Sequence, residues 1–289
     1  MEQIKITESP RDAIQGLPYF IPTQTKADYI NALLKVGFDI IDFGSFVSPK
    51  AIPQLRDTEQ VIKKLDLSGS VSRLMVITGN RKGAETACSF PEITWLSFPF
   101  SASETFLKLN INSSVDKARL LIDDMLVLCD KNNKSLMVYL TMAFGNPYGD
   151  PWNPDLVWRW IEKLQNAGVQ HVALSDITGE ATRESISLIY SVLGSDFPNR
   201  SFNLHLHTTH DTWQEKVDAA FTNGCRHFDT VINGYGGCPM TGYELLGNLN
   251  TMYLVEYCKQ YGVKHSLDEI ALDEVIQRAS IFYRTGEHT

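Results

Sequence analysis

Three of the seven histidines lie within six positions of one another, in the stretch FNLHLHTTHD at 202–211. In a β-strand, side chains two residues apart share a face, so we expect His205 and His207 to point the same way. His210 then falls on the opposite face or beyond the end of the strand. Two neutral imidazoles on one face can bind a transition metal, although a strand histidine is at least as often a hydrogen-bonded core residue. The elements around this stretch decide whether these histidines are metal ligands or core residues.

The composition is that of an ordinary globular protein. The chain has 289 residues, of which 43% are hydrophobic and 21% charged, and no apolar run approaches the roughly 20 residues of a membrane span. A net charge of −8 gives no basic surface for nucleic acid, so we expect neither a nucleic-acid nor a membrane partner. The opening segment MEQIKITESPRD lacks an apolar signal core and a basic presequence, and the five scattered cysteines fit a reducing compartment. These features predict a cytoplasmic location.

Short β-rich runs alternate with amphipathic helical stretches along the whole chain. Several helical stretches, such as PDLVWRWIEKLQNAG at 154–168, end in glycine, as helix stop signals do. Strands apolar enough to be covered on both faces favour a closed α/β barrel, the (β/α)8 TIM barrel, over an open sheet. We expect a single domain over 1–289, with 263–289 as an additional C-terminal helical segment. The eight β-rich runs lie at 4–8, 38–44, 73–79, 93–98, 135–145, 171–176, 202–208 and 227–234.

Active sites of this fold lie at the C-terminal ends of the strands, where this sequence repeatedly places polar and ionisable residues. Each has a structural alternative, since Asp42 or Asp176 could cap the helix that follows. Several charged groups in one barrel mouth are harder to explain in that way, because burying them without a metal or substrate costs several kcal/mol each. The strand ends comprise Glu8 to Asp12, Asp42 to Ser45, Ser175 and Asp176, His205 and His207, and Gly234 to Cys238.

Five stretches of the chain resemble the hydroxymethylglutaryl-CoA lyase family, which belongs to a group of metal-dependent barrels that includes isopropylmalate and homocitrate synthases. The matches run in order over nearly the whole chain, and the pairing of SFVSPK with GGCP is more specific to the lyases than Arg-Asp or His-x-His. An ungapped match down to Asp229 selects His205 and His207 and leaves His210 as a loop residue near the site. The stretches are SPRDAIQ at 9–15, SFVSPKAIPQ at 45–54, NIN at 110–112, HLH at 205–207 and GYGGCPM at 234–240.

The resemblance implies a divalent cation, Mg or Mn, as cofactor and an acyl-CoA ester as substrate. Mixed oxygen and imidazole ligands suit a moderately hard cation that keeps positions open for substrate oxygens, whereas structural zinc sites usually recruit thiolates. The implied metal ligands are Asp12, His205, His207 and Asn248. The implied catalytic residues are Arg11, Asp176, His205 and Cys238, and the implied substrate-binding residues are Gln15, Asp42, Ser45, Gly236 and Gly237.

The family's reaction is a retro-Claisen cleavage of 3-hydroxy-3-methylglutaryl-CoA to acetyl-CoA and acetoacetate, as in leucine degradation. By resemblance, Arg11 would stabilise the thioester oxygen as charge develops on it. Asp176 and His205 would help to move the proton of the tertiary hydroxyl, and Cys238 would protonate the acetyl-CoA carbanion.

The sequence departs from the family pattern close to the implied site. Asp42 stands where the family carries glutamate, and Met252 replaces a second glutamate of the catalytic surroundings. Two alternatives therefore stay open: a related metal-dependent lyase or aldolase for another hydroxyacyl-CoA, and a homologue that binds acyl-CoA with little turnover. A homodimer is one option for the assembly.

Overall fold

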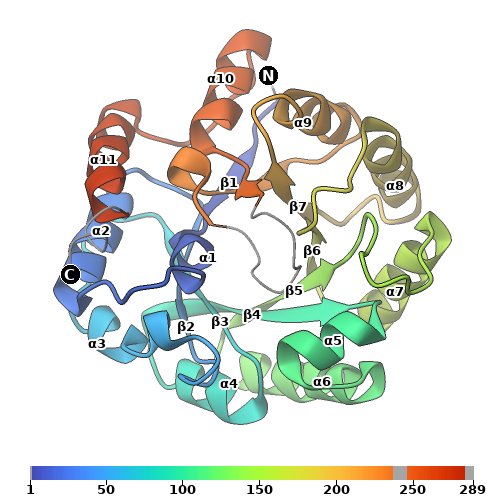
Figure 1. Ribbon diagram of the computed structural model, residues 1–289, viewed down its shortest axis with the longest axis horizontal. Helices are drawn as coiled ribbons and strands as arrows, with labels where there is room; N and C mark the ends of the chain where they lie inside the picture. The colour runs from blue at the N-terminus through green and yellow to red at the C-terminus, as the bar shows by residue number, and fades with distance from the viewer. Residues whose placement is uncertain (1, 237–245, 284–289) are drawn as a thin grey trace.

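The computed structural model describes residues 2–236 and 246–283, and in this part of the chain eight parallel strands form a closed barrel. Each strand pairs with the next along the chain, and β8 pairs with β1 to close the ring (Figure 1). The expected TIM barrel is confirmed. The barrel strands are β1 Lys5–Glu8, β2 Ile40–Ser45, β3 Arg73–Ile77, β4 Ile93–Ser101, β5 Ser135–Thr141, β6 His171–Asp176, β7 Phe202–Thr208 and β8 His227–Thr230.

Helices surround the barrel and cover the outer faces of its strands (Figure 1). Side-chain caps start several of them, as where Asn153 Oδ1 accepts a hydrogen bond from the Leu156 N–H at 2.8 Å ahead of α7. None of the described helices is long and apolar enough to cross a membrane. The helices are α1 Pro10–Gln15, α2 Thr23–Leu33, α3 Thr58–Ile62, α4 Arg81–Cys88, α5 Glu104–Ile111, α6 Val115–Lys131, α7 Pro154–Asn166, α8 Arg183–Asp196, α9 Trp213–Thr222, α10 Thr251–Tyr261 and α11 Glu269–Phe282, with 3-10 turns at Pro53–Leu55 and Ile232–Gly234.

The expected C-terminal helical segment is α11, which packs beside α2. The rings of Tyr29 on α2 and Phe282 on α11 stack at 4.3 Å between centroids. Several strand ends differ from the expectation: β4 continues to Ser101 and β8 ends at Thr230. β5 ends at Thr141 rather than near residue 145, because Met142 adopts a left-handed φ of 58° that takes the chain out of the sheet.

Alternation along the strands separates an inner face from an outer face. Ala173 on β6 belongs to a small apolar cluster with Trp95 and Met137, which fills the interior of the barrel. The register aligns Ser175 of β6 with His205 of β7, two residues beyond the pair formed by Ala173, so both of these side chains also face inward.

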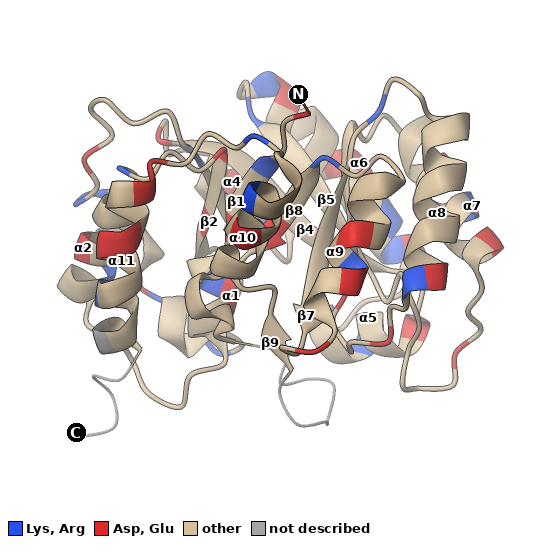
Figure 2. Ribbon diagram, turned by 90° about the horizontal axis from the view of Figure 1, so that it is seen from above, with Lys and Arg blue, Asp and Glu red and all other residues tan. Residues whose placement is uncertain are grey.

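Two short elements cover the C-terminal ends of the strands. Helix α1 begins directly after β1 with Pro10 as its first residue, a position where the missing N–H breaks no helical hydrogen bond. A ninth strand, β9 Gly247–Asn248, runs antiparallel to β7 and places Asn248 opposite His207. Figure 2 shows α1 and β9 at the same end of the barrel, which is the end where the strand β7 finishes.

Candidate metal centre and active site

Asp12, His205 and His207 form a buried group at the C-terminal mouth of the barrel. One potential ligand atom from each residue lies within 4.8 Å of those of the other two. The first turn of α1 supplies Asp12, and successive inward positions of β7 supply the two histidines. The side chains at 205 and 207 therefore share one strand face, while Leu206 between them is buried in the core cluster on the other face.

The chemistry of this group fits a divalent cation. His207 Nε2 lies 3.9 Å from Asp12 Oδ2, is buried, and has no hydrogen-bond partner among the described residues. A buried polar atom left unpaired costs about 1–3 kcal/mol, which coordination to a metal would recover. Burial opposes charge on Asp12, but Arg11 and the two histidines hold the pKa of this carboxyl well below its usual range. Asp12 thus offers an anionic oxygen beside two imidazoles, a donor set that a divalent cation could use.

Asn248, the fourth expected ligand, contacts the same group. Its Nδ2 donates hydrogen bonds to Asp12 Oδ2 and to the Tyr235 carbonyl, both at 2.9 Å. The side-chain oxygen is the atom left for a cation. Gly236 packs against the same group with a left-handed φ of 92°, and a methyl group there would come within 2.8 Å of Ala13 Cα. The chain can pass this close to Asp12 only because residue 236 is glycine.

Asp229 stands beneath His205 on the neighbouring strand β8. Its Oδ2 lies 3.5 Å from His205 Nδ1 and accepts a hydrogen bond from the Tyr139 hydroxyl at 2.7 Å. Burial opposes protonation of His205, yet Asp229 and Asp12 together raise the pKa of this imidazole. A histidine ligand commonly turns its other nitrogen to a carboxylate in this way. Because Nδ1 faces Asp229, Nε2 is the His205 nitrogen left to bind a cation.

Arg11 is fixed by acidic neighbours on two sides. Its Nε and Nη2 both bind Asp42 Oδ2, at 2.8 and 2.7 Å, and its Nη1 binds Asp12 Oδ1 at 2.8 Å. Gln15 joins the same network, since its Oε1 accepts from Arg11 Nη1 at 2.9 Å and its Nε2 donates to Asp12 Oδ1 at 2.8 Å. Burial opposes the charge on Arg11, but Asp42 and Asp12 raise the pKa of its guanidinium further. The guanidinium is permanently charged and held in one orientation.

The carboxylate of Asp42 contacts Arg11 at a point where strand β2 is irregular. The register between β2 and β3 shifts between Asp42 and Gly44. Asp42 is 0% exposed, so it holds Arg11 from beneath and does not line the pocket. The contact that the structure shows for Asp42 is with Arg11; its expected role in substrate binding stays a prediction.

A cavity of about 320 Å³ opens above these groups. Its polar lining comprises Arg11, Asp12, Gln15, the two histidines, Tyr139, Thr141 and Ser175. Asn110, from the NIN stretch, also lines it. The remaining wall is apolar and is formed mainly by Val47, Ile52, Ile77, Phe106, Leu109 and Ile111.

The structure does not bring Asp176 into this group. In the register of β6 and β7, Asp176 aligns with the outward Leu206, whereas its neighbour Ser175 aligns with the inward His205. The carboxylate of Asp176 accordingly faces helix α9, where its Oδ2 lies 3.1 Å from Lys216 Nζ. Strand alternation is the physical reason: of two successive residues at a strand end, only one can face the barrel mouth.

The other expected site residues occupy varied positions. Ser45 Oγ accepts a hydrogen bond from the Val47 N–H at 3.1 Å, so it shapes the pocket wall and does not line the pocket. His210 is exposed, and its Nδ1 pairs with the Tyr253 hydroxyl at 3.0 Å. Gly237 and Cys238 lie outside the described residues.

Tyr139, Asp229 and Lys216 are the site residues that the sequence analysis missed. Tyr139 lies inside an apolar run, SLMVYLT, and only its place on the inward face of β5 distinguishes it from a core aromatic residue. Asp229 and Lys216 stand out only through their partners on other elements, His205 and Asp176. No local pattern in the sequence marks them.

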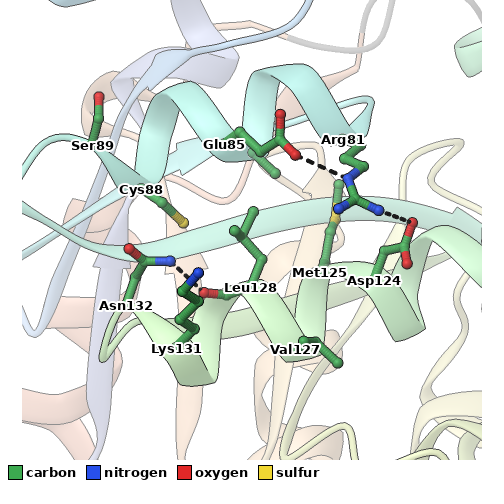
Figure 3. Close-up of a pocket in the computed structure, with 11 residues that line it drawn as sticks. Arg81, Glu85, Cys88, Ser89, Asp124, Met125, Val127, Leu128, Lys131 and Asn132 are labelled. Atoms are coloured by element: carbon green, nitrogen blue, oxygen red, sulfur yellow. Dashed lines mark hydrogen bonds and ion pairs between the residues drawn. The ribbon is translucent and has the colours of Figure 1, made fainter.

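A larger hollow on the outside of the barrel has no comparable chemistry. It measures about 540 Å³ and lies between α4 and α6 (Figure 3). Its guanidinium, on Arg81, is already paired with Glu85 at 2.9 Å and with Asp124 at 3.2 Å. We therefore assign the site to the barrel mouth.

Known proteins show the same relationship in sequence and structure. The family model for HMGL-like proteins matches residues 3–278. A hydroxymethylglutaryl-CoA lyase of Bacillus subtilis is 32% identical over 255 residues, which cover 88% of this chain and 84% of that protein. An (R)-citramalyl-CoA lyase of Chloroflexus aurantiacus is 26% identical over 282 residues, with 94% and 88% covered.

A solved structure extends the similarity to three dimensions. A hydroxymethylglutaryl-CoA lyase from Acinetobacter baumannii, in complex with coenzyme A and 3-methylmalate, superimposes with a TM-score of 0.89 and 30% sequence identity. The match covers 97% of this chain and 91% of that chain. The family model and these relatives show that the chain belongs to the HMGL-like family and is a lyase, in agreement with its barrel and its buried Asp-His-His group.

Proposed function

We propose that this lyase cleaves 3-hydroxy-3-methylglutaryl-CoA to acetyl-CoA and acetoacetate with the help of Mg²⁺ or Mn²⁺. The observation that carries the proposal is the buried group of Asp12, His205 and His207 next to a fixed Arg11 in one cavity. The similarity to hydroxymethylglutaryl-CoA lyases supports the substrate. The citramalyl-CoA lyase among the relatives supports a second candidate, a related hydroxyacyl-CoA ester.

Asp12, His205, His207 and Asn248 would hold the cation. A divalent cation bound there supplies Lewis acidity that lowers the pKa of a substrate hydroxyl. Asp229 would keep the His205 ring in place by facing its Nδ1.

The protein's own groups account for the remaining steps of a retro-Claisen cleavage. His205 Nε2, the nitrogen that does not face Asp229, would accept the proton of the tertiary hydroxyl as the carbonyl of acetoacetate forms and the carbon–carbon bond breaks. It could do so only while Asp12, His207 and Asn248 alone held the cation. The bonding electrons pass to the thioester unit as an enolate. Arg11 faces the cavity and would donate hydrogen bonds to the enolate oxygen. The Cys238 thiol would then deliver a proton to the enolate carbon to give acetyl-CoA.

The apolar wall of the cavity supports this chemistry. Apolar side chains such as Ile77 and Phe106 line the same cavity as the charged groups. In a dry pocket, the interaction between a guanidinium and a developing oxyanion is much stronger than in water. Such a wall also suits the pantetheine arm of a CoA ester. Cytoplasmic location and a homodimer stay predictions of the sequence.

The test is a lyase assay on the purified protein with Mg²⁺ or Mn²⁺, a thiol reductant, and either 3-hydroxy-3-methylglutaryl-CoA or citramalyl-CoA. We expect acetoacetate release from the first ester. His207→Ala and Cys238→Ala should abolish it, while His210→Ala, an exposed histidine outside the cavity, should leave it unchanged. Faster cleavage of citramalyl-CoA would favour the second candidate, and tight binding of both esters without products would favour a binding homologue.

A further inference from the structure

Lys216 is a buried cation in the helical layer next to the site. It lies on α9, and only 3% of the residue is exposed. Its Nζ contacts three oxygens: Asp176 Oδ2 at 3.1 Å, the Gly179 carbonyl at 3.0 Å and the His207 carbonyl at 3.4 Å. All three donor positions of the ammonium therefore have an oxygen nearby.

The three oxygens belong to different segments that converge on the site. Asp176 ends β6, Gly179 lies in the loop that follows, and His207 lies near the end of β7. Asp176 also accepts the Ala181 N–H at 3.1 Å, which ties the far side of that loop to the same carboxylate. Ile177, in the same loop, lines the cavity.

A lysine in this layer needs a reason, because its neighbours Val217 and Ala220 on α9 are buried in the apolar core. Removing an ammonium from water is expensive and is offset only by well-placed anionic and carbonyl partners. A methionine or leucine would fill the space at a lower desolvation cost. An apolar residue could not, however, link the ends of β6 and β7 to the loop that follows β6.

We propose that Lys216 is a positioning residue for the metal centre: with Asp176 it holds the β6–α8 loop and the backbone of His207 in register. The proposal rests on the proposed metal site, and it gives Asp176 a different role from proton transfer. Asp176 faces Lys216 and not the cavity, so its carboxylate acts on the reaction through the position of its neighbours.

The test compares two buried lysines of the intact protein. Lys26, on α2, is 2% exposed and pairs with Asp57, and neither residue lines the cavity, so Lys26→Met is a matched control for Lys216→Met. Both variants should lower the melting temperature. We expect Lys216→Met to weaken Mn²⁺ binding, measured by calorimetry without substrate, by about 10- to 100-fold, the usual effect of losing support behind a metal ligand. Lys26→Met should bind Mn²⁺ within about twofold of the wild type, because it breaks an equivalent ion pair away from the site.

Asp176→Asn separates positioning from proton transfer. A positioning role predicts weaker Mn²⁺ binding in this variant and little further loss in the double variant with Lys216→Met, because the two residues act as a unit. Normal Mn²⁺ affinity with a large loss of kcat in Asp176→Asn would overturn the proposal in favour of proton transfer. Normal affinity in Lys216→Met would overturn it as well.

The remaining outcomes are also decisive. Should Lys216→Met fail to fold, the Mn²⁺ affinities of Asp176→Asn and Lys216→Arg are compared with that of Lys26→Met instead. If the wild type cleaves the ester and binds Mn²⁺ while both Lys216 variants do the same, the proposed function stands and only the role of Lys216 falls. A wild type that binds no Mn²⁺ would overturn the metal assignment together with this inference.

Discussion

Replacing Asp42 by asparagine tests how much of the site depends on a fixed Arg11. Asp42 is fully buried and its Oδ2 receives two bonds from the guanidinium, whose side chain is 7% exposed. Removing one partner of a buried ion pair costs about 3–5 kcal/mol when the other charge is left unpaired. Here Asp12 still neutralises Arg11 from the other side, and asparagine keeps one carbonyl oxygen, so we expect a loss of about 2 kcal/mol.

The same substitution should also lower kcat/KM. Arg11 is held from two sides, and without Asp42 it can turn toward Asp12 and Gln15. Loss of one well-placed donor to a developing oxyanion costs up to about 10²- to 10³-fold in rate, and a donor that is displaced but present should lose about tenfold. Urea unfolding and a steady-state lyase assay measure the two quantities.

Asp123→Asn provides the matched control. Asp123 pairs with Arg119 at 3.1 Å on the exposed face of α6, and both side chains are more than 40% exposed. Exposed pairs of this kind contribute about 0–1 kcal/mol, so this variant should unfold within about 0.5 kcal/mol of the wild type. If Asp42→Asn matched it in stability and in kcat/KM, the view that Asp42 anchors Arg11 would be wrong.

Two further predictions concern residues around the site. Burial raises the pKa of Glu8 to about 8, against 4.5 for an ordinary glutamate. Between these values the folded state keeps a proton that the unfolded chain has lost, so stability should fall by about 1 kcal/mol per pH unit as pH rises from about 5 to 8. Urea unfolding of Glu8→Gln should lack this slope, and equal slopes would mean that Glu8 is charged in the fold. Gly236→Ala should weaken Mn²⁺ binding about tenfold in calorimetry, since its methyl group would lie 3.0 Å from Asn248 Nδ2. Gly149→Ala, at a left-handed φ of 73° in open space, is its control, and equal affinities in the two variants would refute the close packing at 236.

Local patterns in the sequence were sufficient to predict the barrel. The eight β-rich runs correspond to the eight strands because each run is short, apolar and bounded by helix signals, and these properties depend on neighbouring residues only. The shared face of His205 and His207 follows from the same local geometry. Errors arose where a strand end depends on one backbone angle, as at Met142.

Residue roles that depend on contacts between elements were beyond the sequence. Asp176 ends β6 and His205 lies within β7, and only the pairing of the two strands shows that their side chains point to opposite faces. Likewise, Asp229 belongs to the site because the register of β7 and β8 aligns it with His205. Tyr139 belongs to it because its hydroxyl, on β5, donates a hydrogen bond to the Asp229 carboxylate. Register between strands is set by the closure of the whole barrel, so no window of sequence contains it.

The charges of the barrel mouth give a final reason to expect a divalent cation. Among the described residues around the metal group, a single guanidinium, Arg11, faces three buried carboxylates, on Asp12, Asp42 and Asp229. Burial raises the pKa of Asp42, and its like-charged neighbours Asp12 and Asp229 add to this rise against the pull of Arg11. Uncompensated carboxylates in a dry interior cost several kcal/mol each. A divalent cation between Asp12 and the histidines would offset this excess, which a neutral water molecule could not do.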